Sequence, residues 1–143
     1  MGKVVAIDSS PFAAIGARIF DTGHQRVLFN VTSVWKGPAT SQVIVSVANK
    51  VCSAIVHDFY KDEGFLIFAN NGALGSLEAP TNSRTQELGK AAEDLQVLGQ
   101  GKSPAEQAEL ATLFYLQSYW AEVVLGIVLM LALFGFVRAN RAG

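Results

Sequence analysis

The chain has 143 residues, of which half are hydrophobic and 16% are charged, and its formal net charge is -1. This length allows one domain and an appendage. The near-neutral balance gives no basic surface of the kind that binds nucleic acid, and the single cysteine excludes a disulfide within the chain.

The first hundred residues predict a mainly β fold. Apolar residues recur at every second position over 27–31 and 43–47, which is the pattern of strands with one buried face. Five strands are predicted, over residues 3–7, 14–20, 25–35, 41–48 and 64–69. Five strands in a chain of this size indicate a small Greek-key barrel or sandwich, and the pattern alone does not choose between them.

Helical signals follow the strands. The segment 70–82 is rich in Gly and Asn and predicts a loop. A helix is predicted from Thr85 to Leu98, with Leu88, Ala92 and Leu95 on one face and Gly99 as its C-cap. The stretch 103–106, Ser-Pro-Ala-Glu, has the form of a capping box with proline at the first helical position. It predicts a helical stalk over 102–118.

The C-terminal part is the most apolar. Residues 123–137 contain no charge, and 119–138 approaches the roughly 20 residues that cross a bilayer core. Tyr119 and Trp120 are placed as an interfacial aromatic belt, and Arg138 and Arg141 flank the other end. A buried core helix is the alternative, but such a helix would show a polar face and this segment shows none. The sequence therefore predicts a transmembrane helix over 119–138 and a short basic tail over 139–143.

Two signals on topology disagree. The arginines after the apolar segment favour a cytoplasmic C-terminus and a domain outside the membrane. The N-terminal stretch, however, has neither the apolar run nor the cleavage site of a secretory signal. Either the true start lies upstream, or the chain inserts by its C-terminal helix.

Several motifs occur in a fixed order. VLFNVTSVWKG, at 27–37, is followed by Cys52, then by Gly64 with FLIFA, and then by SRTQELGKAAEDLQVLGQG at 83–101. This ordered set resembles the tissue-inhibitor-of-metalloproteinases-like (netrin-like) domain, especially its bacterial membrane-anchored members. The resemblance covers residues 2–101. The residues that carry it are Trp35, Lys36, Gly37, Cys52, Gly64, Arg84, Thr85, Asp94, Leu95 and Gly99.

The resemblance implies an OB-like five-stranded Greek-key barrel with one packed helix. It also implies a structural role for the Trp-Lys-Gly motif. Trp35 would cover one end of the barrel, Lys36 would face water, and Gly37 would permit the turn before Pro38.

The chain departs from the family pattern at two places. The family's inhibitory segment is an N-terminal Cys-X-Cys whose first residue chelates the protease zinc, and MGKVVAI matches the strand that follows it. The family also pairs its loop cysteine with one that would fall near Asn82. Cys52 is therefore expected to be a buried small hydrophobe or, alternatively, to form an intermolecular disulfide.

The remaining polar residues give no catalytic or metal pattern. His24 and His57 lie in loop-like segments, without the spacing of a zinc site or a nucleophile beside them. No catalytic, cofactor-binding or metal residue is predicted.

The sequence as a whole predicts a membrane-anchored, non-catalytic protein-interaction module. The domain, 1–101, would lie outside a bacterial cell membrane and bind a protein, for instance a protease or a membrane complex, while zinc-chelating inhibition is doubtful. The alternatives are a structural subunit of a membrane complex and, last, a small enzyme. No cofactor is predicted.

Overall fold

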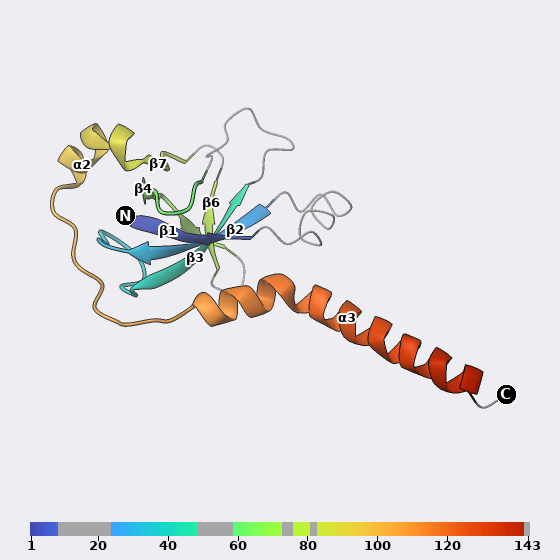
Figure 1. Ribbon diagram of the computed structural model, residues 1–143. Coiled ribbons are helices and arrows are strands. Elements are labelled where there is room, and N and C mark those ends of the chain that lie inside the picture. Colours follow the sequence, from blue (N-terminus) through green and yellow to red (C-terminus); the bar gives the residue numbers. More distant parts are fainter. Residues whose placement is uncertain (9–23, 49–58, 73–75, 81–82, 142–143) are drawn as a thin grey trace.

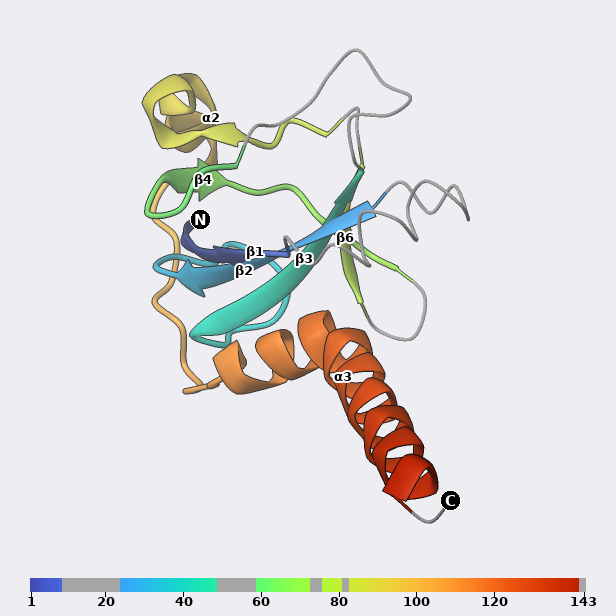
Figure 2. The same cartoon turned by 45° about the vertical axis from the view of Figure 1, so that its right-hand side comes forward.

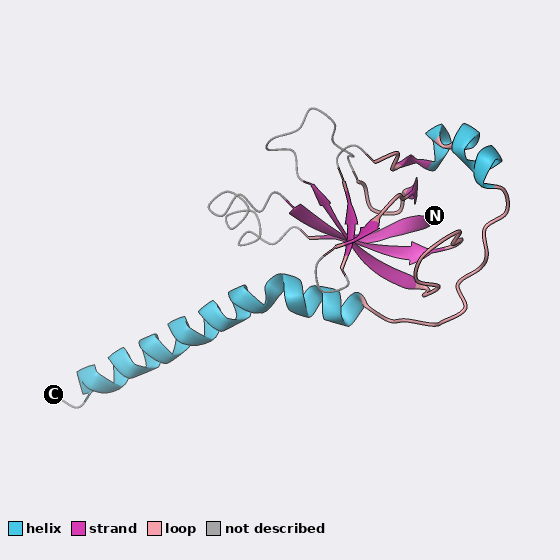
Figure 3. Cartoon of the chain, turned by 180° about the vertical axis from the view of Figure 1, so that it is seen from behind, coloured by secondary structure: helices cyan, strands magenta, loops and turns pink. Residues whose placement is uncertain are grey.

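The fold is a curled β sheet with helices at its two sides, and the last helix extends far beyond the sheet (Figures 1 and 3). A computed structural model describes residues 1–8, 24–48, 59–72, 76–80 and 83–141. The mainly β class predicted from the sequence is confirmed.

In the part of the chain that the structure describes, seven strands form one sheet in the order β5-β6-β3-β2-β1-β4-β7. The strands are β1 (Gly2–Ile7), β2 (His24–Val31), β3 (Gln42–Ala48), β4 (Gly64–Leu66), β5 (Asn70–Asn71), β6 (Leu77–Ala79) and β7 (Gln86–Glu87). All neighbours are antiparallel except β3 and β6. The first four strands lie in the order 4-1-2-3, which is that of a Greek key. The sheet is a half-barrel, with β5 and β7 as its edges in the described residues.

The predicted strand count of five is wrong. Four of the expected strands are present, and the fifth, 14–20, lies outside the described residues. Two short strands, β5 and β6, occupy the segment predicted as a loop, and β7 occupies the start of the predicted helix. Strands of two or three residues are too short to show an alternation, so the sequence pattern misses them.

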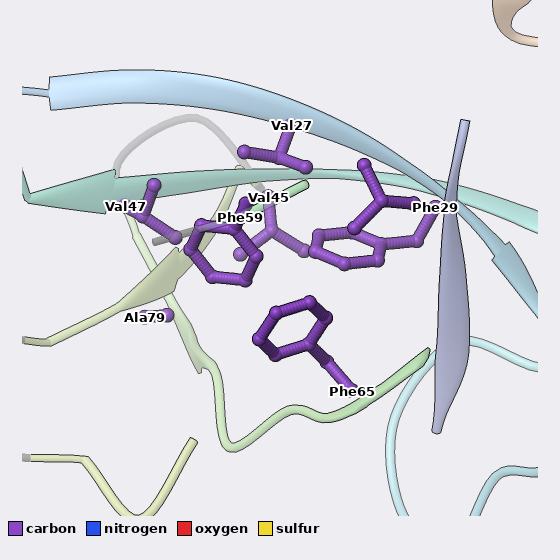
Figure 4. Packing of buried hydrophobic residues seen from close by; sticks show 8 residues of the cluster. Val27, Phe29, Val45, Val47, Phe59, Phe65 and Ala79 are labelled. Atoms are coloured by element: carbon purple, nitrogen blue, oxygen red, sulfur yellow. The ribbon is translucent and has the colours of Figure 1, made fainter. Parts of the chain in front are cut away.

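One face of the sheet carries the main core, which Figure 4 shows. Val27 and Phe29 of β2 point into it together with Val45 and Val47 of β3, as their alternation predicted. Phe59 lies at its centre, with its ring 4.6 Å from that of Phe65 and 5.7 Å from that of Phe29. The cluster is completed by Val4, Phe65 and Ala79.

The opposite face of the sheet carries a smaller core, which receives the C-terminal helix. Leu28 and Ala6 are buried there against Phe114. A β-bulge between Val4 and Ala6 shifts the register of β1 against β2. Because side chains alternate along a strand, this shift moves Ala6 to the face opposite Val4.

The region after β7 differs from the single helix predicted over 85–98. It forms a 3-10 helix, η2 (Leu88–Lys90), and then α2 (Ala92–Leu98). Ala91 is buried and Ala92 is exposed, which is one residue away from the predicted face. A 3-10 helix has fewer residues per turn than an α-helix, which explains why the buried position moves by one residue. Gly99 caps α2 as predicted, with φ 66° and its N–H bonded to the Leu95 carbonyl.

An extended segment, 99–110, then runs along the connection between β2 and β3, and we call it the strap. Val34 and Lys102 exchange two backbone hydrogen bonds of 2.8 Å. Glu106 accepts a hydrogen bond from the Ser41 N–H, also at 2.8 Å. The capping box predicted at 103–106 is therefore wrong, because the backbone of this segment pairs with the sheet instead of forming a helical turn.

The last helix, α3 (Ala111–Arg141), begins after the strap. It bends by 48° between Ala111–Trp120 and Glu122–Phe134. We call Ala111–Trp120 the inner half of α3 and residues 122–141 the outer half. Within the described residues, no single helix meets the length and hydropathy that a membrane span requires, and Ala111–Trp120 and Glu122–Phe134 meet them only as a bent pair. The separate helix expected over 119–138 is thus part of a longer, bent one that starts on the sheet.

Candidate functional site

Gly64 and Leu88 join β4 to η2. A Cβ at Gly64 would lie only 2.5 Å from Leu88 Cδ1, so a side chain at this position would displace Leu88. The missing side chain lets η2 approach the sheet closely. Gly64, one of the residues that carry the family resemblance, therefore has a packing role here.

Arg84 and Asp94 form an ion pair across the β7–α2 region. Asp94 is buried, and its other carboxylate oxygen accepts a 2.7 Å hydrogen bond from Gln86 Nε2. A buried carboxylate is stable when it is paired and hydrogen-bonded in this way. The pair fastens the first turn of α2 to the strand that precedes it.

Thr85 is nearly inaccessible and ties this region to the chain after β4. Its hydroxyl accepts hydrogen bonds from the Phe68 N–H at 2.9 Å and from the Ser83 hydroxyl at 3.0 Å. Thr85 thereby satisfies a backbone group that has no ladder partner. The Arg-Thr motif is structural in this chain.

The Trp-Lys-Gly motif lies where the strap meets the β2–β3 connection. Trp35 Nε1 donates to the Gly99 carbonyl at 3.0 Å, and a Cβ at Gly101 would touch the Trp35 ring. Lys36 is exposed and Gly37 has φ 104°, in agreement with the predicted exposure and turn. The Trp35 side chain holds the strap, whereas the resemblance implied a cover over the end of the barrel.

The N-terminal amine lies beside the same corner. It donates to the Ser33 carbonyl at 2.8 Å, and the Met1 carbonyl accepts from the Thr32 N–H at 3.0 Å. Burial lowers the pKa of the Met1 amine. The first residue is therefore held against the connection that follows β2.

A polar junction that the sequence did not predict joins the inner half of α3 to the sheet. Arg26 of β2 pairs with Asp8 at 3.1 Å and donates to Gln117 Oε1 at 2.9 Å and Ser118 Oγ at 3.2 Å. Its guanidinium also lies 5.7 Å from the centre of the Phe114 ring. The only sequence signal is an arginine in the polar first part of β2, whose sequence is HQRVLFNV.

The inner half has one buried side and one exposed side. Phe114 and Ser118, one turn apart, are buried on the sheet. The exposed side presents Leu113, Leu116, Tyr119 and Trp120. We call this the outward face. Two of the residues predicted at a membrane interface, Tyr119 and Trp120, belong to it.

The outer half is apolar around its whole circumference. Residues 127–131 are consecutive, and each is more than half exposed. At about 100° per residue, five successive positions complete a turn of the helix. Arg138 is exposed near the end of α3, and Arg141 is its last residue.

Of the other candidate residues, the structure describes only His24. Cys52 and His57 lie outside the described residues, and His24 begins β2 where a loop was predicted. Among the residues that the structure describes, no group of three or more His, Cys, Asp or Glu side chains could hold a metal ion. What the geometry offers is a braced domain and a long apolar helix attached to it.

Comparison with known proteins adds no functional evidence, so any functional conclusion depends on this geometry. No family model, no curated protein and no solved structure matches the chain.

Proposed function

We propose that the protein is a membrane-anchored interaction module of the netrin-like type, with its β domain outside the membrane. The observation that carries this proposal is the contrast within α3. Its inner half is locked to the sheet by Phe114 and Arg26, while its outer half leaves the domain with apolar side chains on all sides. In water, a helix of this kind would expose far more apolar surface than monomeric proteins show.

The outer half reaches the length of a lipid anchor only together with its charged ends. At 1.5 Å per residue, the uncharged residues 123–137 extend roughly 22 Å, and the whole of 122–141 extends roughly 30 Å, which is the thickness of a bilayer core. Glu122 lies at its beginning, and Arg138 and Arg141 lie at its end, where charged groups reach the headgroups. The arginines favour a cytoplasmic C-terminus and hence an outside domain.

The domain itself supports an interaction role of the netrin-like type. The motif residues Gly64, Arg84, Thr85 and Asp94 all brace η2 and α2 against the sheet. A half-barrel with a braced helix is compatible with the OB-like barrel of that family. Its partner would be a protein, and the zinc-chelating Cys-X-Cys segment is not part of this sequence.

The test is a topology map of the full chain. A reporter active only outside the cytoplasm is fused ahead of Met1 and, separately, after Gly143. Activity of the first fusion alone supports the proposal, and activity of the second alone overturns the outside placement. Extraction of the membranes at alkaline pH tests anchoring: Leu129→Lys with Leu131→Lys should release the protein, whereas Val97→Lys, at an exposed position of α2, should not.

A structural subunit of a membrane complex is the second candidate, because an all-round apolar helix also packs on other helices. Extraction in mild detergent separates the two. A partner that co-purifies in a fixed ratio would favour the subunit, and a chain that remains alone in the micelle would favour the anchored module.

A further inference from the structure

The outward face of the inner half of α3 is a second exposed apolar surface, separate from the outer half. Leu116 and Trp120 are 66% and 60% exposed, and Leu113 and Tyr119 lie beside them. Residues 111–120 contain no charged side chain. A helix that packs on a domain and faces water normally carries charges on its free side.

The bend of α3 points this face toward the proposed membrane. The outer half turns away from the sheet, so that it leaves on the side opposite the strands (Figures 1 and 2). Membrane helices tilt by about 20° on average from the bilayer normal. When this tilt adds to the bend of 48° in the same plane, the inner half lies about 68° from the normal and thus within about 25° of the membrane surface.

The chemistry of the outward face suits the boundary between headgroups and acyl chains. Tyr119 and Trp120 have an apolar ring and one polar group each, which is the combination enriched at that depth. Tyr115 lies next to them, with its ring 6.5 Å from that of Tyr119. Leu113 and Leu116 supply aliphatic contact on the preceding turns.

We infer that the outward face of Ala111–Trp120 lies in the interfacial layer of the same bilayer that the outer half crosses. The β domain is then held flat against the membrane by its α3 side, and no stalk separates the two. The opposite side, which carries α2, faces the surroundings and is the side that a partner can reach (Figure 1). This inference rests on the proposed membrane anchor.

The chain has two tryptophans, and this allows a direct test. Trp35→Phe with Trp120→Phe gives a tryptophan-free chain, into which one tryptophan is returned as Leu113→Trp or Leu116→Trp. Both positions are exposed, so Phe114 and Ser118 keep their contacts with the sheet. Each full-length variant is reconstituted into phosphatidylcholine vesicles with bromine either near the headgroup end or near the end of the acyl chains.

Two controls fix the depth scale. Met130→Trp in the same background reports the middle of the outer half, and Trp120→Phe alone leaves Trp35 on the strap. We expect about a twofold loss of emission at positions 113 and 116 with bromine near the headgroups, and a smaller loss with deep bromine. Met130→Trp should show the reverse order, and Trp35 should not be quenched.

The outcomes separate this inference from the anchor itself. If Met130→Trp is quenched and both inner-half positions are not, the inner half is a stalk in water and the inference is overturned while the anchor stands. If Met130→Trp is not quenched either, the anchor fails as well. Blue-shifted emission at position 116 without quenching would show that protein, such as a second copy, covers the face, and this too overturns the inference.

Discussion

The two halves of α3 have similar apolar character and opposite surroundings. In the inner half, Phe114 is 1% exposed against Leu28 and Ala6, whereas Phe134 in the outer half is 68% exposed. Hydrophobicity alone does not distinguish these two phenylalanines. The inner half has partners because β1 and β2 present a matching face there, with Arg26 beside it.

This difference shows what an apolar helix without a polar face means. A helix has a distinct buried side only where one side packs on protein. The inner half packs on the sheet mainly through Phe114 and Ser118. In the outer half, residues 127–131 are each more than half exposed, so these apolar side chains require an apolar environment other than the domain. The first of the following predictions tests the contrast directly, and the later ones test the contacts that maintain it.

The largest effect is expected from Phe114→Ala. It removes a fully buried ring from the second core and should lower the free energy of unfolding by about 3–5 kcal/mol. The matched change Phe134→Ala should alter it by less than about 0.5 kcal/mol. Urea unfolding of the full chain in mild detergent, followed by Trp35 emission in a Trp120→Phe background, measures both. Equal effects would show that the two halves share one environment.

Arg26→Met should have the next largest effect, a loss of about 2–3 kcal/mol. The substitution keeps an apolar stem but removes the pair with Asp8 and the bonds to Gln117 and Ser118. Lys3→Met removes an ion pair with Asp62 in which both side chains are exposed, and it should change the free energy of unfolding by at most about 0.5 kcal/mol. A double-mutant cycle with Ser118→Ala measures the coupling between Arg26 and Ser118, and strict additivity would mean that Arg26 does not hold α3 through Ser118.

Gly64→Ala should lower the free energy of unfolding by about 1–2 kcal/mol, because the new Cβ would lie 2.5 Å from Leu88 Cδ1. Gly126→Ala, in the outer half, meets no atom within 4 Å and should be neutral or should favour the helix. The same unfolding measurement applies to both variants. Combining Gly64→Ala with Leu88→Ala should recover part of the loss, and a loss that is unchanged in the double variant would place the strain elsewhere.

Much of the sheet could be predicted from the sequence, for a simple reason. β2 and β3 are long enough to alternate, so Val27, Phe29, Val45 and Val47 could be assigned to one face. The strap could not be predicted. Its Ser-Pro-Ala-Glu stretch satisfies a local rule for helix starts, but pairing with residues 34–42 supplies hydrogen bonds that a first helical turn lacks. A long-range contact of this kind leaves no local signal.

The candidate site, too, could be predicted from the sequence only in part. The apolar stretch of the outer half and the aromatic pair Tyr119 and Trp120 are visible as composition. The bend, the junction at Arg26 and the outward face depend on how α3 meets the sheet. Arg26 and Ser118 are 92 positions apart, and neither residue type at its position predicts the other.

The smallest effect is expected from Trp35→Phe, and it tests whether the strap positions the start of α3. The substitution keeps most of the ring contact with Gly101 and removes the 3.0 Å bond from Nε1 to the Gly99 carbonyl. Because one partly exposed hydrogen bond is removed, the free energy of local opening should fall by about 1 kcal/mol. This corresponds to about a fivefold loss of amide hydrogen-exchange protection at Val34 and Lys102. Lys36→Ala, next to it and exposed, should leave protection unchanged. Protection lost along the strap but kept at the Phe114 amide, which bonds to Leu110, would mean that the sheet face alone fixes the inner half. Protection lost at both places would make the strap part of the attachment.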